Sequence, residues 1–353
     1  MVPVVRELIR SGVEVILAAD GRPLELLRKE FPELRYIRLT GYDIRYQKSG
    51  NFTGQIIRQI PKIIRSYIEE RKALDQIIDE EKIDAVISDN RFGLHNKKIY
   101  SVFVTHQTSI IMPIGWKWFE KILYHLNCSL IERFNECWIP DLEGDKNLTG
   151  DLTRKYPLPK NAKFIGLLTR MNHVQANLKY DLLMLLSGPE PQRTIIEELL
   201  REQAKDFSEK ILMVRGVAER SEKLRVNKNF EVVDFMTSED LNKAIASSAL
   251  VISRSGYSTV MDLAIMQKKA IFIPTLGQTE QEYLAFLFMS MGIAYSEAQS
   301  SFNLSRAVQK SSAYTGFIEQ NDSDLHQHIQ SLLRMIDKHG FIAESNSLQP
   351  LMT

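Results

Sequence analysis

The chain has 353 residues, which is long for one α/β unit and predicts two domains. Lys and Arg number 45 against 44 Asp and Glu, and the net charge of +1 excludes a protein that binds nucleic acid through an excess of basic residues. Two cysteines exclude a disulfide framework and fit a reducing cytosol, and the absence of a long apolar run or a signal-peptide core predicts a cytoplasmic protein without membrane spans.

Helical and strand patterns alternate through the first half of the chain, which predicts a parallel sheet covered by helices. The expected helices are residues 2–10, 23–30, 53–80 and 116–134. The expected strands are residues 13–19, 34–39, 85–88, 101–105 and 136–139. Because the pattern opens inside a helix at Met1, without the usual strand and glycine-rich turn, we expect the first strand of this domain to be missing.

A second alternating series follows a break in the pattern at residues 157–177. Its expected strands are residues 181–186, 210–214, 230–233, 249–253 and 270–274. Its expected helices are residues 194–204, 239–247 and a segment that begins near Ser258. We therefore place a first domain at residues 1–165, a second at residues 166–340 and a tail at residues 341–353. Ligands of open α/β sheets bind at the carboxyl ends of the strands, so a cleft between the two domains is the expected site.

Residues 252–283 are the most informative segment. They indicate a strand, a turn of small residues, a helix, a second strand and a polar loop over residues 277–283. The first N–H groups of such a helix carry the positive end of its dipole and favour an anion. Gly256 has no Cβ to keep a phosphate from the backbone, and Asp262 is placed one turn past Ser258 to accept hydrogen bonds from sugar hydroxyls. An ordinary turn with a serine N-cap is the alternative.

These residues resemble those of a known family. The run Arg254-Ser-Gly-Tyr-Ser-Thr-Val-Met-Asp262, the strand ending at Pro274 and the Gln281-Glu-Tyr segment are similar to the C-terminal domain of MurG-like family 28 glycosyltransferases. The resemblance implies the GT-B fold, an α/β architecture in which two Rossmann-like, doubly wound parallel-sheet domains face a cleft. It also implies transfer of a hexose or N-acetylhexosamine from a UDP-sugar to a cell-envelope glycan or lipid-linked acceptor, with inversion.

The resemblance implies contacts with each part of the donor. They are Phe235 and Met236 for the uracil, Asp262 for the ribose, Ser255, Gly256 and Thr259 for the diphosphate, Gln281 and Glu282 for the sugar, and Ser187 and Gly188 in the turn that opens the second domain. Arg254 either faces the diphosphate or pairs with a helix carboxylate. Asp262 stands where the family has a longer glutamate and Glu282 where it has an amide, so the donor sugar stays open.

Acceptor-side residues are expected at the ends of two strands in the first half. The segment Thr105 to Ser109 resembles the histidine-containing acceptor loop of the family, which implies His106 as the base that takes the hydroxyl proton, with Gln107 beside it. A structural histidine bonded to loop backbone is the alternative. Asp89 and Asn90 follow strand 85–88 and either contact the acceptor or cap a turn.

No metal site or cofactor is expected. Asp322 and Asp324 are spaced like metal ligands, but they precede a helical pattern and are expected to cap it. The apolar segment 110–119 either cradles a lipid and rests on the inner face of the cytoplasmic membrane, or packs as the core face of a helix. Two further interpretations stay open, a nucleotide-sugar-binding protein without turnover and a UDP-sugar 2-epimerase of the same fold.

Overall fold

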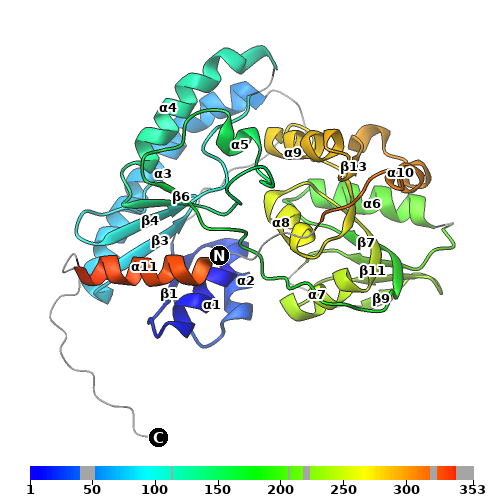
Figure 1. Ribbon diagram of the computed structural model, residues 1–353, viewed down its shortest axis with the longest axis horizontal. Helices are drawn as coiled ribbons and strands as arrows, with labels where there is room; N and C mark the ends of the chain where they lie inside the picture. The colour runs from blue at the N-terminus through cyan, green and yellow to red at the C-terminus, as the bar shows by residue number, and fades with distance from the viewer. Residues whose placement is uncertain (40–51, 113, 206, 218–222, 319–323, 339–353) are drawn as a thin grey trace, which may run out of the picture.

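A computed structural model describes residues 1–39, 52–112, 114–205, 207–217, 223–318 and 324–338 (Figure 1). The expected tail at 341–353 and Asp322 lie outside the described residues. Over the described ranges, no helix has the length and apolar character needed to cross a bilayer.

Parallel strands form two sheets in the first half of the chain. One sheet pairs β1 (Ile16–Ala19) with β2 (Arg35–Arg38). The other has the order β3 (Ala85–Asp89), β4 (Tyr100–Val104), β5 (Glu136–Ile139) and β6 (Ala162–Phe164). β4 and β5 are buried along their whole length, as short apolar strands covered on both faces should be.

Helices accompany these strands as the alternating pattern predicts. They are α1 (Val2–Arg10), α2 (Gly21–Glu30), α3 (Phe52–Glu81), the 3₁₀ turn η1 (Ile114–Phe119), α4 (Glu120–Ile131) and the short α5 (Asp151–Arg154). The single helix expected at 116–134 is therefore divided. The buried carboxylate of Glu120 accepts a 2.9 Å hydrogen bond from the backbone N–H of Met112 and pairs with Lys155, which fixes the start of α4 at Glu120.

A seven-stranded sheet forms the centre of the second half. Its order is β13 (Tyr295–Ser296), β12 (Lys269–Phe272), β11 (Ser248–Ser253), β7 (Tyr180–Leu185), β8 (Ile211–Val214), β10 (Phe230–Val233) and β9 (Lys223–Arg225). All pairs are parallel except β9 with β10. Its helices are α6 (Gln192–Ala204), α7 (Ser238–Ala246), α8 (Tyr257–Ile265), α9 (Thr279–Ser290), the 3₁₀ turn η2 (Gln299–Ser301) and α10 (Leu304–Ser311). This is the parallel α/β architecture that the sequence predicts.

The prediction of a polar loop over residues 277–283 is wrong, because α9 begins at Thr279. Gln281 and Glu282 therefore lie in the first turn of a helix. Acidic residues in that turn interact favourably with the helix dipole, which is why so polar a segment is helical.

The last helix, α11 (Leu325–Lys338), lies against the first half of the chain (Figure 1). Nδ1 of His326 is 2.6 Å from a carboxylate oxygen of Glu7 on α1, and the ring of His328 is 6.3 Å from that of Trp138 on β5. The helix α11, which follows the second series of strands, thus packs on elements of the first half.

Candidate active site

The turn after β11 has the backbone that the anion-binding hypothesis requires. Gly256 is the N-cap of α8 with φ −70° and ψ 141°, and a Cβ at this position would meet nothing within 4 Å. The start of α8 is therefore open on the side that a Gly256 side chain would occupy. Ser255 is buried and its Oγ donates a 2.7 Å hydrogen bond to the carbonyl of Gln281, which links this turn to α9. Thr259 follows in the first turn of α8.

Arg254 holds several loops together from a buried position. Nη1 donates to the carbonyls of Ile273 and Pro274 at 2.9 and 3.1 Å, and Nη2 donates to the carbonyl of Gln192 and to Oε1 of Gln299. Burial lowers the pKa of Arg254 to about 10. Its partners are carbonyl oxygens rather than the helix carboxylate expected as one alternative. Its contact with a diphosphate stays a prediction.

The residues assigned to the donor sugar brace the loop that follows β12. Oε1 of Gln281 accepts a 2.9 Å hydrogen bond from the backbone N–H of Thr275. A carboxylate oxygen of Glu282 accepts one of the same length from Gly277, and the Glu282 side chain is exposed. Each side chain keeps polar atoms for other partners, so their contact with the sugar stays a prediction.

Asp262 lies on α8 where the two halves of the chain join. Thr169, in the connecting segment, donates a 2.6 Å hydrogen bond to Oδ1 of Asp262. Burial raises the pKa of the Asp262 carboxyl to about 6, although the Thr169 hydroxyl and the nearby Arg170 both favour the charged form. The carboxylate assigned to the ribose is therefore close to its protonation point near neutral pH.

The remaining donor residues lie at the carboxyl ends of neighbouring strands. Ser187 and Gly188 follow β7, and Gly188 has φ 106°, a conformation that favours glycine. Phe235 and Met236 follow β10, and the ammonium group of Lys29 on α2 lies 4.9 Å from the centre of the Phe235 ring. Because the strands are parallel, the structure brings these residues to the edge of the sheet that also carries the turn after β11.

His106 lies beyond the end of β4 and contacts the second half of the chain. Its Nε2 is 3.2 Å from Oε1 of Glu280, at ion-pair distance but without hydrogen-bond geometry. Its ring stacks on Tyr257 with centroids 4.6 Å apart and planes 6° apart. These partners are side chains of the opposite half, not the loop backbone of the structural alternative. A role as base stays a prediction.

The other acceptor-side candidates are arranged around the ends of β3 and β4. Asn90 has φ 56°, and its Oδ1 accepts a 3.3 Å hydrogen bond from the hydroxyl of Thr105. The backbone N–H of Gln107 donates to the same hydroxyl oxygen at 3.1 Å. Asp89 ends β3 with an exposed side chain. Asn90 thus shapes the turn, and contact of the three with an acceptor stays a prediction.

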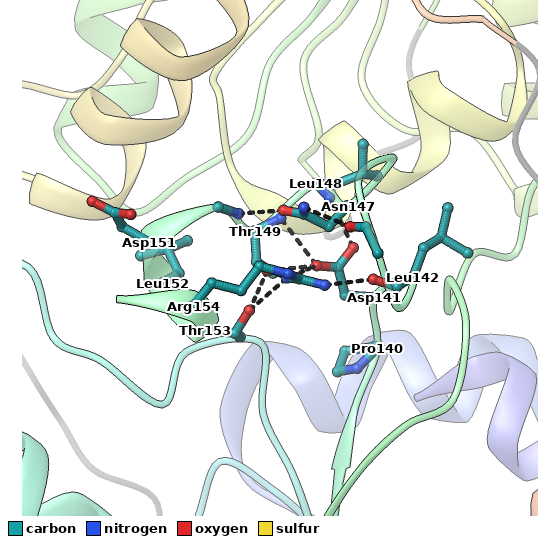
Figure 2. Close-up of polar contacts among 12 residues, drawn as sticks. Pro140, Asp141, Leu142, Asn147, Leu148, Thr149, Asp151, Leu152, Thr153 and Arg154 are labelled. Carbon is teal, nitrogen blue, oxygen red and sulfur yellow. Dashed lines mark hydrogen bonds and ion pairs between the residues drawn. The ribbon is translucent and has the colours of Figure 1, made fainter. Parts of the chain in front are cut away.

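A loop that follows β5 contacts the second half of the chain, and the sequence did not predict a role for it. Figure 2 shows its centre, the fully buried Asp141, which accepts hydrogen bonds from the Thr149 hydroxyl at 2.5 Å, from Nη1 of Arg154 at 2.9 Å and from the Leu148 backbone at 2.8 Å. The sequence signal that could have identified Asp141 is its position just past a buried strand.

Two tyrosines of the second half are bound to this loop. The Tyr257 hydroxyl donates to the carbonyl of Pro140 at 2.8 Å, and the Tyr283 hydroxyl accepts from the backbone N–H of Asp151 at 2.6 Å. Gly150 has φ 50°, and a Cβ there would lie 2.3 Å from the Tyr283 hydroxyl. Each tyrosine directly follows a predicted donor residue, Gly256 or Glu282, so the donor side is fixed to the opposite half at two points.

Comparisons with known proteins agree with this architecture. The model of the glycosyltransferase family 28 C-terminal domain matches residues 183–334, which include the turn after β11 and α9. The UDP-N-acetylglucosamine--N-acetylmuramyl-(pentapeptide) pyrophosphoryl-undecaprenol N-acetylglucosamine transferase of Actinobacillus pleuropneumoniae serotype 3 (strain JL03) is 22% identical over 303 residues, 82% of this chain and 78% of that protein.

Solved structures show the same fold at low sequence identity. Acinetobacter baumannii MurG has a TM-score of 0.55 and 15% identity, covering 95% of this chain and 94% of that chain. The spinosyn rhamnosyltransferase SpnG has a TM-score of 0.60 and 15% identity, covering 96% of this chain and 95% of that chain. Residues 183–334 therefore match a glycosyltransferase family 28 C-terminal domain, and the chain has the two-domain α/β fold of these solved glycosyltransferases.

Proposed function

We propose that the protein transfers a hexose or N-acetylhexosamine from a UDP-sugar to a cell-envelope glycan or lipid-linked acceptor, with inversion and without a metal ion. The observation that carries this proposal is the turn after β11, where the space beside Gly256 is open and Asp262 follows on α8, within the family-matched region. The Actinobacillus relative, an N-acetylglucosamine transferase with a pyrophosphoryl-undecaprenol acceptor, supports the same donor and acceptor classes.

The chemistry follows from the charge that develops during transfer. As the glycosidic bond breaks, negative charge grows on the leaving diphosphate, and preorganised N–H groups at the start of α8 stabilise it. His106 takes the proton of the attacking hydroxyl. A single displacement from the face opposite the diphosphate inverts the anomeric carbon. In this mechanism the backbone supplies the positive potential that a metal ion supplies in other transferases.

A panel of nucleotide sugars tests the donor assignment directly. We expect UDP and at least one UDP-sugar to raise the melting temperature, because a ligand that binds only the folded state stabilises it, while GDP- and CMP-sugars have smaller effects. The best donor is then incubated with lipid-linked and glycan acceptors, and release of UDP is measured. The absence of any shift with uridine nucleotides contradicts the proposal.

Asp262→Ala should weaken UDP binding by about 1–3 kcal/mol, because the ribose hydroxyls lose a half-buried hydrogen-bond acceptor. Calorimetry measures this, with Glu239→Ala as the control, since Glu239 is an exposed carboxylate on α7 that pairs with Lys243. The pKa of about 6 adds a second expectation. As the pH falls through 6, Asp262 takes up a proton and loses acceptor capacity, so uridine binding weakens in the wild type but not in Asp262→Ala. A flat wild-type profile contradicts the ribose assignment.

We further propose that an apolar face formed by η1 and α4 contacts the membrane that holds a lipid-linked acceptor. Trp118, Ile122 and Leu126 are spaced four residues apart, share one face and are 68, 47 and 57% exposed. Lys117 and Lys121 are exposed beside them and suit anionic lipid head groups. The expected core role of segment 110–119 does not extend to Trp118, whose side chain faces outward.

Combined Trp118→Ser and Leu126→Ser substitutions should weaken binding to vesicles with anionic lipids at least about tenfold, because two exposed apolar side chains no longer enter the lipid. Co-sedimentation measures the bound fraction. Leu224→Ser is the matched control, because Leu224 is 55% exposed in the second half of the chain. Equal binding by the double variant and the wild type contradicts this membrane contact.

A further inference from the structure

Glu280 belongs to the first turn of α9, and its carboxylate contacts residues of two other segments. It interacts with the backbone N–H of Tyr257, the first residue of α8, and its Oε1 is 3.2 Å from Nε2 of His106. Burial raises the pKa of Glu280, but the interactions with His106 and with the Tyr257 N–H outweigh it, and the pKa lies below its usual value. The side chain is therefore an anion at neutral pH.

The Glu280 carboxylate therefore lies at the first residue of α8, whose N–H is one of those that a diphosphate bound at this turn would contact. The N–H groups at the start of a helix point into a small volume, and two anions there repel each other. The volume beside Gly256 is open, so a diphosphate can approach the same N–H groups from that side. His106, stacked on Tyr257, adds a nitrogen that either anion can approach.

We propose that Glu280 is a built-in anion that fills the diphosphate position in the ligand-free protein and that the donor displaces it. This inference rests on the proposed function and adds the residue that competes with the donor. Displacement moves the carboxylate away from Nε2 of His106, which then faces the acceptor hydroxyl. Glu280 therefore weakens donor binding and makes the base available only after the donor has bound.

The test compares UDP and uridine binding by calorimetry in the wild type, Glu280→Gln and Glu280→Ala. Glutamine keeps the shape of the side chain without its charge, and alanine removes the competing oxygen as well. We expect both variants to bind UDP about fivefold or more tightly than the wild type, on the scale of a charge at a partly buried helix end. Uridine, which has no phosphate, should bind with unchanged affinity.

Glu202→Gln is the control for the loss of one negative charge, because Glu202 is 72% exposed on α6 and pairs with the exposed Lys205 that follows this helix. Equal or weaker UDP binding in both Glu280 variants overturns the inference. An equal gain for UDP and uridine also overturns it, because a competitor of the diphosphate leaves the nucleoside unaffected. If no protein in the set binds UDP or uridine, the donor assignment fails and the inference fails with it.

Discussion

His106→Ala is expected to lower turnover about 100- to 10,000-fold, the usual contribution of a general base, while the protein still binds UDP. The imidazole lies at the end of β4, between the two halves, where an acceptor hydroxyl and the donor bound after β11 can meet. Without it, the hydroxyl must lose its proton to water during the attack. Release of UDP from the donor and acceptor pair found in the screen measures the rate.

The control is His173→Ala, because His173 is exposed in the segment that connects the two halves. A structural role for His106 gives a different pattern of results. The ring stacks on Tyr257, so a purely structural histidine would lower the melting temperature and weaken UDP binding together with the rate. Unchanged turnover in His106→Ala contradicts the assignment of the base.

The order and type of most elements could be predicted from the sequence because the signal is local. Residues 136–139 and 230–233 were expected as strands, and both have these bounds in the structure. The two failures have different causes. The first turn of α9 is polar because acidic residues suit a helix N-terminus, and such a turn has the composition of a loop. The Glu120 contact that divides the helix expected at 116–134 depends on Met112 and Lys155, outside any periodic pattern.

In the candidate site, too, features set by adjacent residues could be predicted and features set by distant contacts could not. The turn at Gly256 could be located because a strand, small residues and a helix start are adjacent in the sequence. The pairing of His106 with Glu280 could not, because it depends on how two separate sheets approach each other. The partners of Arg254 could not be predicted either, because they come from segments that are distant in the sequence. The charge of Arg254 and its place in the motif suggest an anion partner, whereas its guanidinium donates hydrogen bonds to carbonyl oxygens of three other segments.

Gly256→Val is expected to weaken UDP binding at least about tenfold without a loss of stability. Valine adopts φ −70° and ψ 141° readily, and no atom lies within 4 Å of the added Cβ, so the fold has no reason to change. The isopropyl group instead projects beside the first N–H groups of α8 and keeps the phosphate from them, which costs about 1–3 kcal/mol for each charge-assisted hydrogen bond lost. Calorimetry with UDP and a melting curve measure the two effects separately.

Gly256→Ala provides a graded comparison, because one methyl group obstructs less of the same volume. Affinity should therefore fall from glycine to alanine to valine while the melting temperature stays constant. A parallel fall in both quantities would mean that the turn requires glycine for folding, which the open space and the negative φ argue against. Unchanged UDP affinity in Gly256→Val would place the diphosphate away from α8, and the donor site would then have to be sought at another strand end of the same sheet edge.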